Sequence, residues 1–112
     1  MEKKVEYNII TGCVLDVLPA LERSVLYFES RYISVKVGIT GRDPQERFNE
    51  HLAERRWNRM IVKYKTRSET LINKLEDYFI LYHPRLKNNW IGYSHLSAGG
   101  DNYFYILLYG KR

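Results

Sequence analysis

The chain has 112 residues, of which 45% are hydrophobic and 28% charged, and its formal net charge is +5. This length fits one domain with a single core, and the hydrophobic content excludes an intrinsically disordered chain. The single cysteine excludes an intramolecular disulfide and a zinc site built from several cysteines, and no stretch approaches the roughly 18 apolar residues of a membrane span. We therefore expect a cytoplasmic protein, or a nuclear one in a host with a nucleus, and its positive charge favours a polyanionic partner.

The first third of the chain predicts strands around one short helix. Residues 5–11 are β-prone, and residues 13–22 place apolar side chains at near-helical spacing. Residues 24–29 and 32–39 are rich in Val, Ile, Tyr and Phe, and the second run alternates apolar with polar positions. Because only two residues separate these runs, we expect a β-hairpin with Lys36 on the face opposite to the valines.

The next element is a well-marked helix over residues 43–55. It begins with the sequence DPQE, in which an acid can cap the helix, proline takes the first helical position and glutamate closes a capping box. Phe48 and Leu52 are then expected to point inward. Arg47 and His51, also one helical turn apart, are left to share another surface.

The second half of the chain predicts two more strands and a helix. Residues 59–65 alternate as a strand, residues 66–69 form a second capping box, and residues 103–109 read as a closing strand. The helix between them has an apolar stripe made by Leu71, Ile72, Leu75, Phe79 and Ile80. We expect a single α+β domain over 1–112, with a small, mainly antiparallel β-sheet flanked by helices and an extra C-terminal strand.

One acidic residue stands beside this apolar stripe. Glu76 has Ile72 and Ile80 as its i±4 neighbours, and a carboxylate there loses hydration unless a cation or a donor compensates. It either lies at the edge of the stripe, bonded to an arginine, or serves a site. Glu69 lies seven residues earlier on a similar face and is the competing candidate.

Four basic or phenolic side chains can each be interpreted as structural or as functional. Arg47 and His51 either form a solvated basic helix face or converge on a site with groups from elsewhere in the fold. Tyr27 is either an ordinary sheet residue or, if Lys36 lies beside it on the predicted hairpin, a phenol whose pKa the positive charge lowers.

These residues, in this order, resemble the GIY-YIG nuclease superfamily over residues 24–90. The most specific part is VGITGRDPQERFNEHL, which is similar to the family's stretch from the second half-motif through an arginine to a histidine. The later YHPRLKNN resembles the family's glutamate helix followed by proline and asparagine. Tyr27 is the one residue kept from the first half-motif, and Lys36 replaces the second tyrosine, as in some restriction endonucleases of the family.

The resemblance implies a divalent-metal-dependent endonuclease that hydrolyses phosphodiester bonds, usually of DNA, with one Mg²⁺ or Mn²⁺ per site. The site residues it implies are Tyr27, Lys36, Arg47, His51, Glu76 and Asn88. In these roles Glu76 holds the ion, and Tyr27, assisted by Lys36, takes the proton of the attacking water. Arg47 holds the phosphate, His51 contacts phosphate or assists proton transfer, and the asparagine positions phosphate or water.

A basic surface and two alternatives complete the expectations. The residues predicted to contact the nucleic-acid backbone, which positions a ligand without specifying its sequence, are Arg42, Arg55, Arg56, Lys63 and Lys65. The protein would act as a monomer or a homodimer, with no membrane partner. The alternatives are a binding module on the same fold that no longer cuts, and a basic protein-interaction domain in which the site residues lie scattered.

Overall fold

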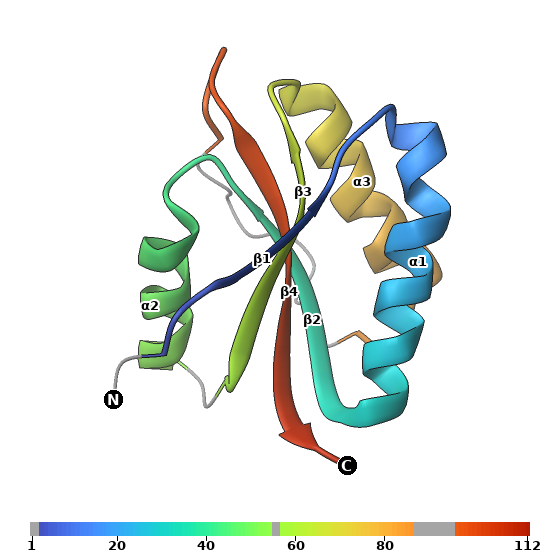
Figure 1. Ribbon diagram of the computed structural model, residues 1–112, viewed down its shortest axis with the longest axis vertical. Helices are drawn as coiled ribbons and strands as arrows, with labels where there is room; N and C mark the ends of the chain where they lie inside the picture. The colour runs from blue at the N-terminus through green and yellow to red at the C-terminus, as the bar shows by residue number, and fades with distance from the viewer. Residues whose placement is uncertain (1–2, 55–56, 87–95) are drawn as a thin grey trace.

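Strands and helices alternate along the whole chain in the computed structural model, which describes residues 3–54, 57–86 and 96–112 (Figure 1). The elements are β1 (Glu6–Ile10), α1 (Val14–Arg31), β2 (Tyr32–Thr40), α2 (Pro44–Glu54), β3 (Arg59–Thr66), α3 (Glu69–Tyr82) and β4 (Asn102–Lys111). The strands form one sheet with the order β1-β3-β4-β2.

The strand that comes last in the chain lies inside the sheet. β4 is antiparallel to both of its neighbours, β3 and β2, whereas β1 and β3 are parallel. The expected α+β class, with a small, mainly antiparallel sheet flanked by helices and a C-terminal strand, is confirmed. Among the described strands, β2 therefore lies at an edge of the sheet and pairs with β4 alone.

Helices cover the two faces of the sheet unequally. α1 and α3 pack on one face and α2 on the other (Figure 1). A hydrophobic core lies on each face of the sheet, and successive residues of a strand point alternately to the two faces. On β2, Val35 and Val37 face α1 and α3, so Lys36 points to the face that carries α2, where Phe48 and Met60 are buried.

The predicted hairpin over residues 24–39 is wrong. Residues 24–29 belong to α1, a helix of 18 residues that ends where β2 begins. The β-branched and aromatic run had favoured a strand, but Val17, Leu21 and Val25 recur every fourth residue and are fully buried against the sheet. This helical spacing, satisfied by tertiary packing, outweighs the local β-propensity.

The short helix predicted over residues 13–22 forms the first part of α1 but continues to Arg31 instead of ending before Ser24. The remaining predicted strands and helices lie where expected. α2 starts at Pro44, with Phe48 buried and Leu52 partly buried as expected. α3 is capped by Ser68, whose hydroxyl accepts a hydrogen bond of 3.1 Å from the Leu71 backbone N–H. Its inward stripe is Ile72, Leu75 and Phe79.

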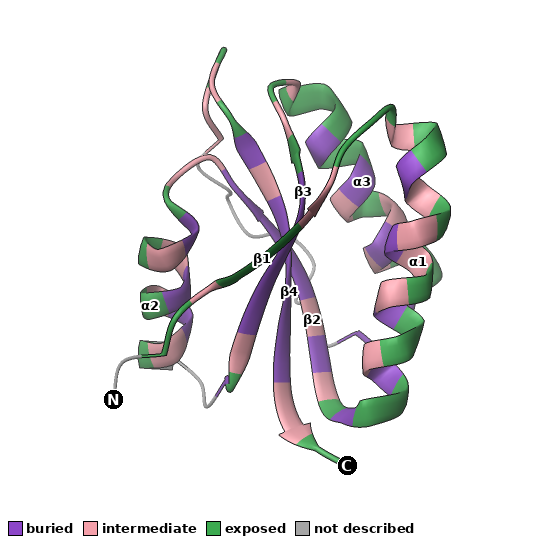
Figure 2. Cartoon of the chain, in the orientation of Figure 1, coloured by how far each residue is buried: buried purple, intermediate pink, exposed green. Residues whose placement is uncertain are grey.

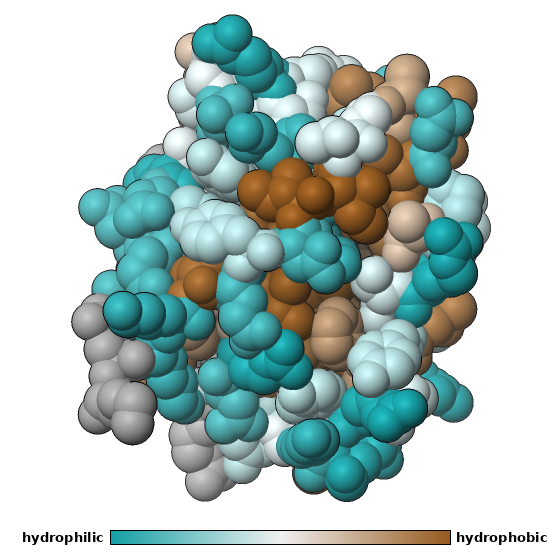
Figure 3. Space-filling model, viewed as in Figure 1, coloured by the Kyte–Doolittle hydropathy of each residue, from teal (hydrophilic) through white to brown (hydrophobic). Residues whose placement is uncertain are grey.

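β1, at one end of the sheet order, is the least buried strand. Figure 2 shows that most of β1 is exposed while the central strands are buried. On this face apolar side chains are visible close to β1 within a mainly hydrophilic surface (Figure 3). None of the helices in the described part of the chain is long and apolar enough to cross a membrane.

Candidate active site

Ionisable side chains from β2, α2, α3 and β4 lie near enough to shift one another's pKa values. The charges of Lys36 on β2 and Arg47 on α2 both act on Glu76 of α3 and on His51 of α2. Tyr105 of β4 completes the group, because its hydroxyl lies 2.8 Å from His51 Nε2 and, after burial, its pKa is lowered by Arg47 and raised by Glu76. We call these five residues, Lys36, Arg47, His51, Glu76 and Tyr105, the candidate site.

The pairing of β2 with β4 places the tyrosine. Tyr105 lies directly opposite Gly38 in the antiparallel register, and its ring crosses over that glycine. A Cβ atom on Gly38 would lie 2.4 Å from the Cζ and Oη atoms of Tyr105, closer than non-bonded atoms approach. Glycine at this position therefore makes room for the phenol rather than for a turn.

His51 is held as a neutral base. The residue is 1% exposed, and burial, followed by the charges of Arg47 and Lys36, lowers its pKa to about 3. Its Nε2 faces the Tyr105 hydroxyl, and its Nδ1 has no hydrogen-bond partner in the described part of the chain. A neutral imidazole keeps one nitrogen lone pair with which to accept a proton.

Arg47 is shared between the site and a surface ion pair. Glu50, three residues along α2, accepts hydrogen bonds on one oxygen from Arg47 at 2.8 Å and from Arg42 at 2.7 Å. Burial lowers the pKa of Arg47, but the bonds to Glu50 and Tyr105 outweigh it and raise the pKa overall. Arg47 thus stays charged and is already oriented toward the tyrosine.

Glu76 is the most perturbed acid of the site. Burial is the main cause, with Asp77 second, and together they raise the pKa of Glu76 to about 7 although Lys36 and Arg47 lower it. The ionised carboxylate is therefore short of solvation. Such a group gains free energy from any cation that brings its own water.

Tyr105 is held as a neutral phenol in the free protein. The residue is 1% exposed, and burial raises its pKa to about 12 in spite of the opposing charge of Arg47. Its hydroxyl can donate to one partner and accept from another. It either donates to His51 Nε2 or accepts from it, depending on which ring nitrogen of His51 carries the proton.

Tyr27 does not lie on a strand beside Lys36, as the predicted hairpin required, and its catalytic role stays a prediction. Tyr27 lies on the outer surface of α1 and is 53% exposed, with the Arg31 guanidinium 4.8 Å from its ring centre. α1 packs on the sheet face opposite to the one to which Lys36 points, so no hairpin places Tyr27 beside Lys36. The phenol of the candidate site comes from Tyr105 instead.

The remaining predicted residues divide into three groups. Asn88, Arg55 and Arg56 lie outside the described residues. Lys65 is exposed and Arg42 is partly exposed, as a contact surface requires. Lys63 is only 5% exposed at an irregularity of β3, where burial lowers its pKa, so it is not part of an open basic surface.

Tyr105 was missed because it lies far from its partners in sequence. It stands 69 positions after Lys36, within the run YFYILLY, which reads as an ordinary buried strand. The available signal was Gly38, since a glycine inside a strand indicates close approach by another group. Sequence alone does not say which of ten tyrosines approaches it.

The donor set for a metal ion is small. In the residues that the structure describes, no three His, Cys, Asp or Glu side chains are grouped to share an ion. An ion at Glu76 would have one protein carboxylate and would take its other ligands from water and phosphate. This arrangement suits Mg²⁺, which keeps several waters and often binds one or two carboxylates beside substrate phosphate.

Comparison with known proteins returns no relatives. No model of a protein family, no curated protein and no solved structure matches the chain.

Proposed function

We propose that the protein is a divalent-metal-dependent nuclease that hydrolyses phosphodiester bonds of nucleic acid, with DNA as the first substrate to test. The observation that carries the proposal is the convergence of Lys36, Arg47, Glu76 and Tyr105 from four separate elements. A half-buried carboxylate with its pKa near 7, an arginine and a buried phenol that act on one another fit phosphoryl transfer better than a structural role.

The geometry supports a GIY-YIG-type site in a permuted order. That resemblance calls for a tyrosine-bearing strand antiparallel to the strand of Lys36 and Gly38. β4 meets this requirement, with Tyr105 opposite Gly38, although it follows the other motifs in the chain instead of preceding them. In this proposal, Tyr105 on the C-terminal strand takes the place that the resemblance gave to Tyr27.

The side chains divide the work as follows. Arg47 binds the scissile phosphate through its planar fork of donors and offsets the charge that develops on the phosphoryl oxygens. Lys36 adds a second positive charge beside the same position. The Tyr105 hydroxyl accepts the proton of the attacking water while its own proton passes to His51 Nε2, 2.8 Å away.

The bound substrate itself makes this proton path easier. The charges of Arg47 and Lys36 are two of the causes that lower the pKa of His51. A phosphate anion between them offsets both charges, so His51 becomes a stronger base when the substrate is present. Glu76 would hold the metal ion, which when bound supplies positive charge next to the phosphoryl oxygen and the leaving oxygen.

The second candidate function is nucleic-acid binding without cleavage. It is favoured by one observation, the pKa of about 12 that burial gives to Tyr105. A phenol with this pKa keeps its proton at neutral pH, so the phenolate that would act as a base is rarely present. The same cationic residues would then bind phosphate only.

A plasmid-nicking assay with Mg²⁺ or Mn²⁺ distinguishes these functions. We expect the wild type to nick DNA, and Arg47→Ala, Glu76→Gln and Tyr105→Phe each to lower the rate by about a hundredfold or more. Thermal melting of each variant shows whether the fold is retained. An intact plasmid across several divalent metals, together with salt-dependent DNA binding, would leave only the binding module.

The matched control is Tyr27→Phe. This change also removes one phenol hydroxyl, but from an exposed position on α1. We expect wild-type rates from it. Loss of activity in Tyr27→Phe with full activity in Tyr105→Phe would overturn the permuted site.

A further inference from the structure

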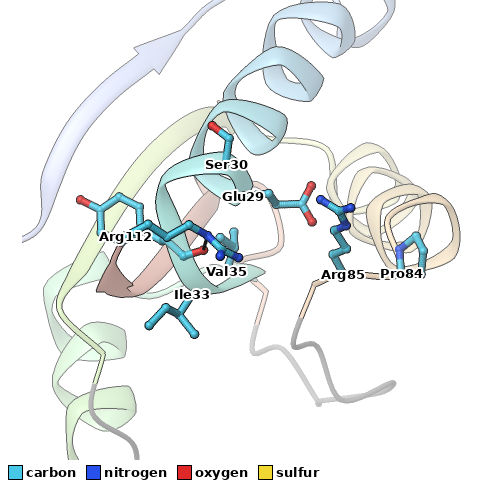
Figure 4. A pocket seen from close by; sticks show the side chains of 8 residues that line it. Glu29, Ser30, Ile33, Val35, Pro84, Arg85 and Arg112 are labelled. Atoms are coloured by element: carbon cyan, nitrogen blue, oxygen red, sulfur yellow. Dashed lines mark hydrogen bonds between the residues drawn. The ribbon is translucent and has the colours of Figure 1, made fainter.

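A second polar cleft lies at the start of β2, away from the candidate site (Figure 4). Its volume is about 540 Å³, which falls within the range of roughly 300–1,000 Å³ common for ligand pockets. The walls come from the end of α1, the first half of β2, the turn after α3 and the end of β4. Its charged lining residues are Glu29, Arg85 and Arg112.

Glu29 is a buried carboxylate without adequate partners. Its side chain is 7% exposed, and its only ion pair in the described part of the chain joins Oε1 to His83 Nδ1 at 3.9 Å. Oε2 has no hydrogen-bond partner there. The residue also lies in the last turn of α1, where the helix dipole disfavours negative charge. Packing and helix stability therefore give no reason for a carboxylate at this position.

Two arginines line the cleft on different sides of Glu29 (Figure 4). The Glu29 carboxylate and the Arg85 guanidinium extend toward one another in this view. No ion pair joins these two groups in the described part of the chain. Arg112 donates from Nε to the Tyr32 carbonyl at 3.2 Å, which leaves its terminal nitrogens for another acceptor. The cleft thus offers one acceptor for an N–H group and two guanidinium groups for an anion.

We propose that this cleft binds one nucleotide, with the amino group of the base donating to Glu29 Oε2 and the phosphate bonded to Arg85 and Arg112. A carboxylate is a fitting acceptor for the amino group of cytosine, and guanidinium groups pair with phosphate or stack on a base. This inference rests on the proposed function for its choice of a nucleotide rather than another ligand that carries both an N–H group and an anion.

The position of the cleft relative to the candidate site supports that choice. Val35 lines the cleft and Lys36 belongs to the site, so both adjoin the same edge strand. α3 links them as well, since Glu76 lies six residues before the helix ends at Tyr82. The turn after this helix supplies Pro84 and Arg85 to the cleft. In this proposal, a nucleic-acid strand bound at the candidate site extends along β2 and α3 to the cleft.

The test is a titration of the protein, without metal, with deoxycytidine monophosphate, deoxycytidine and inorganic phosphate, followed by NMR shifts of the cleft residues. We expect the nucleotide to bind more tightly than either half. Glu29→Met should weaken binding of the nucleotide and the nucleoside about tenfold or more and leave phosphate binding unchanged. Arg85→Ala should weaken the nucleotide and phosphate, whereas Arg31→Ala, an exposed arginine outside the cleft, should weaken neither.

Stability separates this role from a structural one. Because Glu29→Met replaces an unpaired buried carboxylate with an apolar chain of similar length, we expect its melting temperature to equal or exceed that of the wild type. A lower melting temperature would assign Glu29 to structure and overturn the proposal. Equal nucleotide binding by the wild type, Glu29→Met and Arg85→Ala would also overturn the proposal. So would binding of free glycine, a small ligand with both an N–H group and an anion, by a protein that does not bind the nucleotide.

The outcome is also independent of cleavage. Nucleotide binding that is lost in Glu29→Met, in a protein that never nicks DNA, would uphold the cleft and refute the nuclease. Nicking that depends on Arg47, with no nucleotide bound in the cleft, would do the reverse.

Discussion

Glu76 should make the protein less stable as the pH rises through neutrality. Its pKa is raised from 4.5 to about 7 in the folded chain. Below pH 4.5 the carboxyl group is protonated in both the folded and the unfolded chain. Between pH 4.5 and 7 only the unfolded chain gives up this proton, so unfolding becomes easier, and above about pH 7 the loss is complete.

The size of the effect follows from the two pKa values. Each pH step between them is worth about 1.36 kcal/mol, so the full loss is about 3 kcal/mol and, after allowance for the partial exposure of Glu76, about 2 kcal/mol. Glu76→Gln removes the titration and keeps the shape of the side chain. The free energy of unfolding of this variant, minus that of the wild type, should therefore grow by about 2 kcal/mol between pH 4.5 and pH 8.

Urea unfolding at four pH values measures this difference directly. Other titrating groups act on both proteins alike and cancel when the two are subtracted. Glu69→Gln, an exposed glutamate in the first turn of the same helix, is the control and should show no such growth. A Glu76→Gln difference that stays flat from pH 4.5 to pH 8 would refute the burial argument and remove the main physical support for a cation site.

Three further outcomes follow from the site. At pH 8, millimolar Mg²⁺ should raise the melting temperature of the wild type but not of Glu76→Gln, and an equal rise in both would place the ion elsewhere. Gly38→Ala should cost about 1–3 kcal/mol in urea unfolding, because its Cβ would lie 2.4 Å from the Tyr105 ring, and adding Tyr105→Ala should cost less than the two changes predict separately. Since the pKa of His51 falls from 6.5 to about 3 on folding, the wild type should lose stability as the pH drops below 6.5, and His51→Gln should reduce that loss in an acid titration followed by circular dichroism.

The sequence predicted the parts of the fold that depend on local signals. The DPQE start of α2 and the TRSE start of α3 are short-range patterns, and both helices lie where expected, although Ser68 and not Thr66 caps α3. Residues 24–29 misled because their composition suits a strand while their helical stripe begins earlier, at Val17. The decision between the two was made by burial against the sheet, which no local window contains.

The candidate site also contains residues that local sequence signals indicate and residues that only long-range pairing places. Arg47, His51 and Glu76 were found from their positions on helices, where spacing of three or four residues fixes a face. Tyr105 was not, because its place depends on which strand pairs with β2, and that is a choice among distant segments. Glu29 gave no signal either, since in sequence it is an ordinary acid near the end of a helix.

The central position of β4 governs how the protein reaches its folded state. β2 and β3 have no hydrogen bonds to one another in the sheet order, so residues 32–66 cannot complete a sheet before residues 102–111 insert between them. On a ribosome the tyrosine emerges after every other site residue. Folding should thus be slow and dominated by long-range pairing, and the nascent chain stays without a finished site until the last strand arrives.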